Sequence, residues 1–224
     1  MKLNKYISEF LGTAFLFCAV VGSGIMGQSL TNDESIILFV NATITFFALY
    51  FLISSFESYS NHFNPVVSLA FFLNKEISFK TFVLFTLLQI LGAIIGVLTA
   101  NIMFDVELFQ LSNKNRSGFN IYLSEIIATF GLVFFILISN KDKIALIVAS
   151  YIGAAYWFTS STSFANLAGT IGRMFSDSFA GISPENVFSF GLAQIIGSII
   201  AFIVYKYFFK AVSYTHLRAH ETRT

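Results

Sequence analysis

The chain has few charged residues. Only 11% of its 224 residues are Asp, Glu, Lys or Arg, whereas 56% are hydrophobic. An ordinary soluble domain carries about 25% charged residues, so this composition excludes that class of protein. The formal net charge of +1 gives no reason to expect a nucleic acid or an acidic partner. A mean hydropathy of +0.76 indicates instead that the main partner of the chain is the lipid bilayer.

Cysteine is almost absent as well. The single Cys18 excludes an internal disulfide and any cysteine-based zinc site, and its apolar surroundings are typical of a small buried thiol. The sequence also lacks the paired-histidine metal motif, the nucleophile elbow and the glycine-rich phosphate loop of many enzymes. We therefore expect no cofactor, no bound metal and no catalytic residue, and we predict that the chain is not an enzyme.

Long apolar stretches are what the sequence does contain. A bilayer core about 30 Å thick needs about 20 apolar residues per helix, and six stretches meet that length. They cover approximately residues 6–28, 35–55, 79–104, 120–140, 143–161 and 187–209. The first stretch has no cleavage pattern of a signal peptide and is expected to be retained. The sequence thus predicts an all-α membrane protein with six transmembrane helices.

Lysine and arginine are distributed unevenly between the two sides of this topology. One side carries Lys2, Lys5, Lys75, Lys80, Lys141, Lys143, Lys206 and Lys210. The other side carries Lys114, Arg116 and Arg173. Because positively charged loops stay in the cytoplasm, we predict a multi-pass protein of the cell membrane with both termini cytoplasmic.

Three short motifs occur twice, once in each half and in the same order. The equivalent residues are Glu9 and Glu125, Asn64 and Asn166, and Gln89 and Gln194. Each copy contains three spans, an odd number, so the second copy must cross the membrane in the inverted orientation. We predict one repeat at about residues 1–105 and a second at about 120–210. Inverted repeats of this kind place their functional site near the bilayer midplane.

Each asparagine begins a short apolar segment that is too short to cross a bilayer. The segments run from Asn64 to about residue 73 and from Asn166 to about residue 175. As helices of about ten residues they would be about 15 Å long, half a bilayer. Irregular backbone at membrane depth must be covered by protein or line water, so two half-helices that meet tip to tip predict an aqueous path. Their positive N-terminal ends would repel cations and protons there.

This ordered set of motifs resembles the aquaporin, or major intrinsic protein, family over nearly the whole of residues 1–210. It consists of His62-Phe63-Asn64-Pro65-Val66 with Ser68, Ser163-Phe164-Ala165-Asn166-Leu167-Ala168, and the paired Glu-x-x-x-Thr and Gln-x-x-Gly motifs. The resemblance implies an hourglass channel domain of six helices plus two half-helices, usually a homotetramer with one pore per subunit. It also implies a passive channel for water or small uncharged solutes such as glycerol, urea or arsenous acid, which excludes protons and ions.

The resemblance implies roles for several residues. Asn64 and Asn166 would donate hydrogen bonds to a permeating oxygen, although helix capping alone is the plainer alternative for an asparagine. His62 would line the cytoplasmic side of the pore or pack within its loop. Glu9 and Glu125 would accept hydrogen bonds from the re-entrant loops and hold the pore backbone in place. Pro65 would support the first turn of its half-helix.

The sequence also departs from the family pattern. The two Asn-Pro-Ala motifs of the family are Asn-Pro-Val and Asn-Leu-Ala here. The third residue after the second asparagine, usually an arginine of the constriction, is Gly169, and the nearest arginine is Arg173, about one helical turn later. This resembles a bacterial subgroup that lacks the filter arginine, some of whose members are linked to arsenous acid. Arg173 either lines a widened vestibule or pairs with Asp177 at i, i+4.

Counting back with the usual spacing of the family gives the other constriction positions. They are Ile44, Ala154 and Ser163, and together with Gly169 they predict a wide and weakly polar opening. A secondary transporter is the alternative function, since such proteins also have inverted repeats and broken helices. An ion-coupled carrier needs an acidic group at the midplane, whereas Glu9 and Glu125 lie near span ends. The final residues, 211–224, resemble a translated sequencing adapter and are predicted to be a non-native tail.

Overall fold

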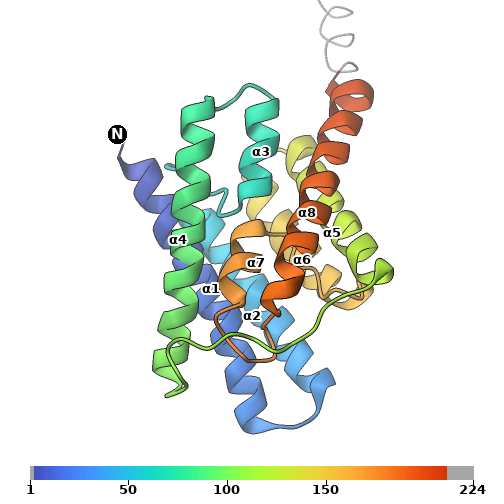
Figure 1. The fold of residues 1–224 in the computed structure, drawn as a ribbon. Helices are drawn as coiled ribbons and strands as arrows, with labels where there is room; N and C mark the ends of the chain where they lie inside the picture. The colour runs from blue at the N-terminus through green and yellow to red at the C-terminus, as the bar shows by residue number, and fades with distance from the viewer. Residues whose placement is uncertain (1–2, 211–224) are drawn as a thin grey trace, which may run out of the picture.

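The computed structural model describes residues 3–210, which form helices joined by loops, with no strand in this range (Figure 1). The helices are α1 (Asn4–Leu30), α2 (Glu34–Ser55), α3 (Pro65–Leu73), α4 (Phe79–Met103), α5 (Phe119–Ile138), η1 (Lys141–Lys143), α6 (Ile144–Phe158), α7 (Leu167–Arg173), α8 (Pro184–Val204) and η2 (Tyr205–Phe209). The predicted tail at residues 211–224 lies outside the described residues.

Six of these helices correspond to the six predicted spans. Within the described residues, five are long and apolar enough to cross a membrane, namely α1, α2, α4, α5 and α8 continued by η2. The sixth, α6, has 15 residues and is therefore about 22 Å long. It ends at Phe158, earlier than the predicted 161, because the chain turns there into the loop that leads to Asn166.

Two short helices have the length of half a bilayer or less. Helix α3 has 9 residues and α7 has 7, and each begins directly after an asparagine that serves as its N-cap. In Figure 1, α3 lies in the upper half of the molecule and α7 lies below it, near the centre. Both ends of the described chain are on the α3 side, as an even number of membrane crossings requires (Figure 1).

The two halves use the same close helix crossing. A Cβ atom added at Gly92 of α4 would lie 2.5 Å from the carbonyl oxygen of Phe10 in α1, and one added at Gly197 of α8 would lie 2.5 Å from the carbonyl oxygen of Ile126 in α5. Small residues allow helix backbones to approach in membranes. The two helix pairs are equivalent by the sequence duplication, as the predicted inverted repeat requires, and the prediction of an all-helical fold is confirmed for the described residues.

Candidate pore

The asparagines that cap α3 and α7 join the two half-helices tip to tip. Asn64 accepts from the backbone N–H of Val66 at 3.1 Å and donates from Nδ2 to the carbonyl of Ala165 at 2.7 Å. In the opposite direction, Asn166 donates from Nδ2 to the carbonyl of Phe63 at 2.8 Å. Each asparagine therefore caps its own helix and binds the other loop at the same time.

These contacts use only part of each amide group. A side-chain amide nitrogen carries two N–H donors, and the reciprocal contact uses one of them. Asn64 and Asn166 both line one cavity. One N–H of each amide is thus left to donate to a molecule in that cavity.

Two fully buried carboxylates hold the loops in front of the asparagines. Glu9 accepts from the backbone N–H groups of His62 at 2.9 Å and Phe63 at 2.8 Å. Glu125 accepts from the equivalent groups of Phe164 at 2.9 Å and Ala165 at 3.0 Å. A buried charge is tolerated when hydrogen bonds replace its hydration, and these N–H groups supply them.

The same hydrogen bonds orient the backbone carbonyls. The N–H and C=O of a trans peptide point in opposite directions, so a carbonyl whose partner N–H faces Glu9 or Glu125 points away from that carboxylate. The carbonyls concerned belong to Asn61, His62, Ser163 and Phe164, and all four residues line the cavity. The carboxylates therefore position acceptors along the cavity, in addition to supporting the loops.

Two glutamines form a further layer that the sequence revealed only as a duplication without a role. Gln89 donates from Nε2 to Glu9 at 2.7 Å and to Ser68 at 3.0 Å. Gln194 donates from Nε2 to Glu125 at 2.7 Å and to Thr170 Oγ1 at 2.9 Å. Each glutamine connects a carboxylate of a long helix to a hydroxyl of a half-helix, so it fixes the half-helix against the rest of its repeat.

Both loops contain backbone strain at the same position. Phe63 and Ala165, which directly precede the asparagines, have positive φ angles of 50° and 43°. A residue other than glycine in this left-handed region costs about 1–3 kcal/mol and persists where its surroundings impose it. Here the carboxylate holds the N–H of each residue and the opposite asparagine holds its carbonyl. The strain therefore marks the place where the two loops are fixed to each other.

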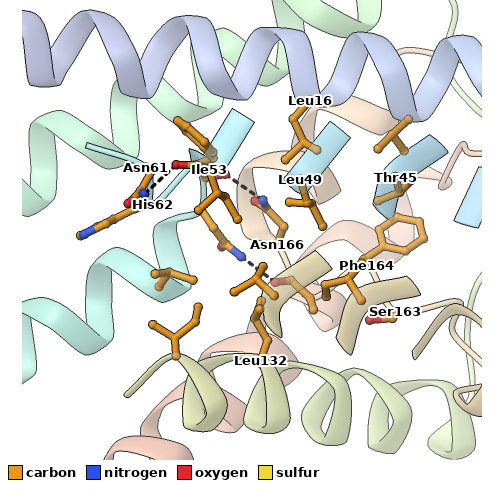
Figure 2. A pocket seen from close by; sticks show the side chains of 18 of the residues that line it. Leu16, Thr45, Leu49, Ile53, Asn61, His62, Leu132, Ser163, Phe164 and Asn166 are labelled. Atoms are coloured by element: carbon orange, nitrogen blue, oxygen red, sulfur yellow. Dashed lines mark hydrogen bonds between the residues drawn. The ribbon is translucent and has the colours of Figure 1, made fainter. Parts of the chain in front are cut away.

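The cavity passes both asparagines and has a volume of about 80 Å³. A cavity needs about 10–15 Å³ to hold one water molecule, so this one has room for several. Figure 2 shows His62, Asn166 and Ser163 along it, with Leu16, Leu49 and Leu132 between them. The lumen is thus mostly apolar, with polar groups at a few places, which is the usual composition of a small-molecule site.

His62 lines this cavity on the α3 side of the asparagines. Its Nδ1 atom lies 3.0 Å from the hydroxyl of Ser68, and its ring packs on Phe71 with 4.4 Å between the ring centroids. His62 therefore lines the cavity and also packs against its own loop and α3, so the two alternatives from the sequence are both present. Pro65 is the first residue of α3, as expected.

The structure corrects two of the predicted constriction positions. Ile44 is 38% exposed and Ala154 is also exposed, and neither lines the cavity. Thr45 and Tyr156 line it instead, and their hydroxyl oxygens are 3.0 Å apart. Consecutive helical residues differ by about 100° around the axis, so a small error in counting turns the wrong side chain toward the pore. Ser163 lines the cavity as predicted from the spacing.

Gly169 does not widen the opening as its lack of a side chain suggested. It is buried and does not line the cavity, and a Cβ atom added there would overlap the ring of Phe17. Phe17 of α1 lines the cavity at that place. The expectation of a wide, weakly polar opening is therefore corrected, because an aromatic ring from another helix fills the space.

Arg173 also lines the cavity, and it is only 3% exposed. Its Nε donates to the carbonyl of Ala180, and its guanidinium lies 3.3 Å from the centroid of the Phe164 ring. The alternative pairing with Asp177 is absent: α7 ends at Arg173, and Asp177 accepts instead from the backbone N–H of Asn113 at 2.9 Å. The arginine is therefore displaced along the sequence and not missing from the cavity.

The sequence and fold are similar to those of known channels. The family model described as Major intrinsic protein matches residues 1–170. The chain belongs to the major intrinsic protein family. It is 40% identical over 202 residues to "Aquaglyceroporin AqpS" of Rhizobium meliloti (strain 1021), covering 88% of this chain and 87% of that protein. It is 26% identical over 217 residues to "Probable aquaporin TIP2-2" of Oryza sativa subsp. japonica, covering 92% of this chain and 87% of that protein.

A solved structure of the family has the same fold. The X-ray structure of the aquaglyceroporin from Plasmodium falciparum matches with a TM-score of 0.72 at 19% identity, covering 95% of this chain and 98% of that chain. This major intrinsic protein is thus a multi-pass membrane protein that forms a passive channel for water and small solutes, and it is not an enzyme. The alternative of a secondary transporter is not retained.

Proposed function

We propose that this channel conducts small uncharged solutes that carry hydroxyl groups, together with water, and excludes protons and ions. Glycerol is the first expected solute, and metalloid hydroxides such as arsenous acid belong to the same class. Urea has no hydroxyl group, but it is small and uncharged, and its carbonyl oxygen can accept the same hydrogen bonds. The observation that carries the proposal is the pair of free N–H donors of Asn64 and Asn166, which remain after the reciprocal contact between the loops. A passing hydroxyl or water oxygen can accept from both.

Proton exclusion follows from the same geometry. A water oxygen that accepts two hydrogen bonds from the asparagines has both lone pairs occupied, so it cannot take a proton from a neighbouring water. The positive N-terminal ends of α3 and α7 meet at this point and oppose a cation as well. Neutral molecules avoid both penalties, since they bring no charge to the centre of the membrane.

The solute range is supported by the cavity and by the relatives. Most of the wall of the lumen is apolar, which suits a molecule with C–H groups better than a column of water alone. Two of the similar proteins are named aquaglyceroporins. We assign pore-lining roles to Asn64, Asn166, His62, Ser163 and Arg173, and supporting roles to Glu9, Glu125 and Pro65.

We further infer that the chain forms a homotetramer in the cell membrane with both termini cytoplasmic. The α3 side, where both ends of the described chain lie (Figure 1), would then be the cytoplasmic side and would hold most of the lysines. Many large apolar side chains are exposed on the single chain, as a lipid or subunit contact requires. The channel domain would cover residues 1–210, as two repeats at about 1–105 and 120–210.

Stopped-flow light scattering of proteoliposomes tests this function. Vesicles that contain the purified protein are mixed with a hyperosmotic solution of glycerol, urea or a non-permeant sugar. Uptake of arsenous acid is measured separately. We expect faster glycerol equilibration than in empty vesicles, no saturation with concentration, and no response to a proton or sodium gradient. A saturable or gradient-driven flux would contradict the channel, and a flux limited to water would contradict the solute range.

A further inference from the structure

The ring of Phe17 occupies the space that a side chain at position 169 would need. A Cβ atom added at Gly169 would overlap two atoms of that ring, at 2.0 and 2.1 Å. Phe17 is buried, comes from the middle of α1, and lines the cavity. The predicted constriction drew on spans 2 and 5 and on the second loop, but not on the first span. The aromatic ring is therefore an additional wall of the lumen that the sequence did not indicate.

The family pattern has an arginine at the position of Gly169. In this chain an arginine lines the same cavity, but it is Arg173, the last residue of α7. Arg173 is held by the carbonyl of Ala180 through Nε and by the face of the Phe164 ring. Within residues 3–210 no carboxylate pairs with it and no group accepts from its terminal nitrogens. A guanidinium has five N–H donors in a planar array, so Arg173 keeps several donors for the lumen.

Residues with hydroxyl groups line the same cavity. Thr45 donates to the carbonyl of Asn41 at 2.8 Å, so the contact of 3.0 Å between Thr45 and Tyr156 requires the tyrosine to donate. Ser163 is 2% exposed and lines the cavity, and its hydroxyl oxygen has no partner among the described residues. Buried hydroxyls are nearly always hydrogen-bonded, but this oxygen has almost no accessible surface, so a partner in the lumen would require the side chain to turn.

We propose that Phe17 and Arg173 together form the selectivity filter of this channel in place of an arginine at position 169. Phe17 sets the width and offers an apolar face, while Arg173 donates hydrogen bonds. A short polyol fits this arrangement, because its oxygens can accept from Arg173 while its C–H groups contact the ring. Urea fits less well, since its carbonyl oxygen can accept from Arg173 but it has no C–H face for the ring. The inference rests on the proposed conduction of neutral solutes.

The first experiment measures glycerol, urea, erythritol and water permeability of the Phe17→Ala and Phe17→Leu variants in proteoliposomes. We expect erythritol and urea permeability to rise relative to glycerol, because the lumen widens and loses its apolar face. Phe15→Ala is the matched control, since Phe15 is on the same helix and is 60% exposed. If the alanine variant does not fold, the leucine variant decides, because it keeps an apolar side chain at this place. Unchanged solute ratios in a folded Phe17 variant would overturn the proposal.

The second experiment tests Arg173 by a change that removes its charge. For Arg173→Gln we expect the ratio of glycerol to water permeability to fall by about tenfold, the factor that one lost hydrogen bond to a charged group gives. A purely structural role would lower all permeabilities by the same factor, and that result would overturn the assignment.

The third experiment tests whether Phe17 occupies the space that an arginine at position 169 would need. Gly169→Arg alone is expected to prevent folding or abolish flux, because the new side chain overlaps Phe17. Combination with Phe17→Ala removes the obstacle and is expected to restore inserted, conducting protein. Normal flux in the single variant would overturn the proposal, as would failure of the double variant to improve on it. If the wild-type protein itself conducts no neutral solute, the proposed function fails; if it conducts but these variants keep its selectivity, only the filter fails.

Discussion

The hydroxyl oxygen of Ser68 lies 3.0 Å from Nδ1 of His62, in a contact whose direction depends on which nitrogen of the imidazole carries the proton. Gln89 donates to the same hydroxyl, and among the described residues Nδ1 is the one acceptor within reach of the hydroxyl hydrogen. The equivalent hydroxyl of the other repeat, on Thr170, instead donates to the carbonyl of Asn166 at 2.9 Å. His62 is therefore expected to be neutral, with its proton on Nε2.

The variant Ser68→Ala tests this assignment. Without the hydroxyl, neither tautomer of His62 is preferred by the loop, and both are expected to be populated. Nitrogen-15 spectra of histidine-labelled protein in lipid, with His216 and His220 replaced, distinguish the two tautomers. A single population protonated on Nε2 is expected in the otherwise wild-type protein, and a single population protonated on Nδ1 would contradict the hydrogen-bond order.

Aspartate at position 64 or 166 would separate capping from solute binding. Asn64→Asp and Asn166→Asp keep the oxygen that accepts from the half-helix but lose the amide donors, including the one that binds the opposite loop. In the protein that still folds and inserts, we expect glycerol and water permeability to fall by about tenfold or more, because a charged carboxylate replaces hydrogen-bond donors in the lumen. Stopped-flow measurements on matched protein amounts check this. Wild-type permeability in either inserted variant would show that the amides do not serve the solute.

Replacement of a buried loop carboxylate is expected to destabilise the fold. In Glu125→Gln an amide NH2 group replaces one carboxylate oxygen, so at least one of the donors on Phe164, Ala165 and Gln194 loses its acceptor. A lost hydrogen bond to a charged group costs about 1.5–3 kcal/mol. Thermal unfolding in detergent measures the loss. The control is Glu185→Gln in the exposed first turn of α8, where a change within about 0.5 kcal/mol is expected. Equal stability of the two variants would argue against a supporting role for Glu125.

The close helix crossings are expected to tolerate no side chain. In Gly92→Ala and Gly197→Ala the new Cβ meets a backbone carbonyl of the neighbouring helix, and overpacking of this kind costs about 1–3 kcal/mol. Gly153→Ala is the control, because its Cβ would lie 3.5 Å from Phe46, an ordinary contact. The melting temperature and the elution volume of the detergent-solubilised protein report the effect. If all three variants behave alike, the crossings are looser than described.

Much of the fold could be predicted because its signals are local. The length of an apolar stretch decides whether it crosses a bilayer, and α1, α2, α4, α5 and α8 agree with the predicted spans. The asparagines and proline also act locally, since they begin α3 and α7 where they stand in the sequence. Helix α6 ended at Phe158 and not at the predicted 161, because the loop that follows it already turns back into the protein.

The candidate site was predictable where it depended on the duplication and not where it depended on helix rotation. The paired motifs indicated that Glu9, Glu125, Asn64 and Asn166 act together, and their reciprocal hydrogen bonds agree with that expectation. Ile44 and Ala154 were wrong because a count along the chain does not give the direction of a side chain on a packed helix. The direction of the side chains on the packed helices places Thr45 and Tyr156 at the cavity instead.

The membrane environment, the six spans, the two half-helices and the inverted relation of the halves could be read from the amino-acid sequence. These depend on the transfer of apolar side chains into lipid and on backbone groups that must be satisfied nearby. What surrounds the lumen became known from the packed fold: Phe17 fills the space beside Gly169, and Arg173 turns inward over Phe164. Packing can join residues as far apart in the sequence as Phe17 and Gly169, and the direction of each side chain depends on that packing, so no local pattern records which of them share a volume.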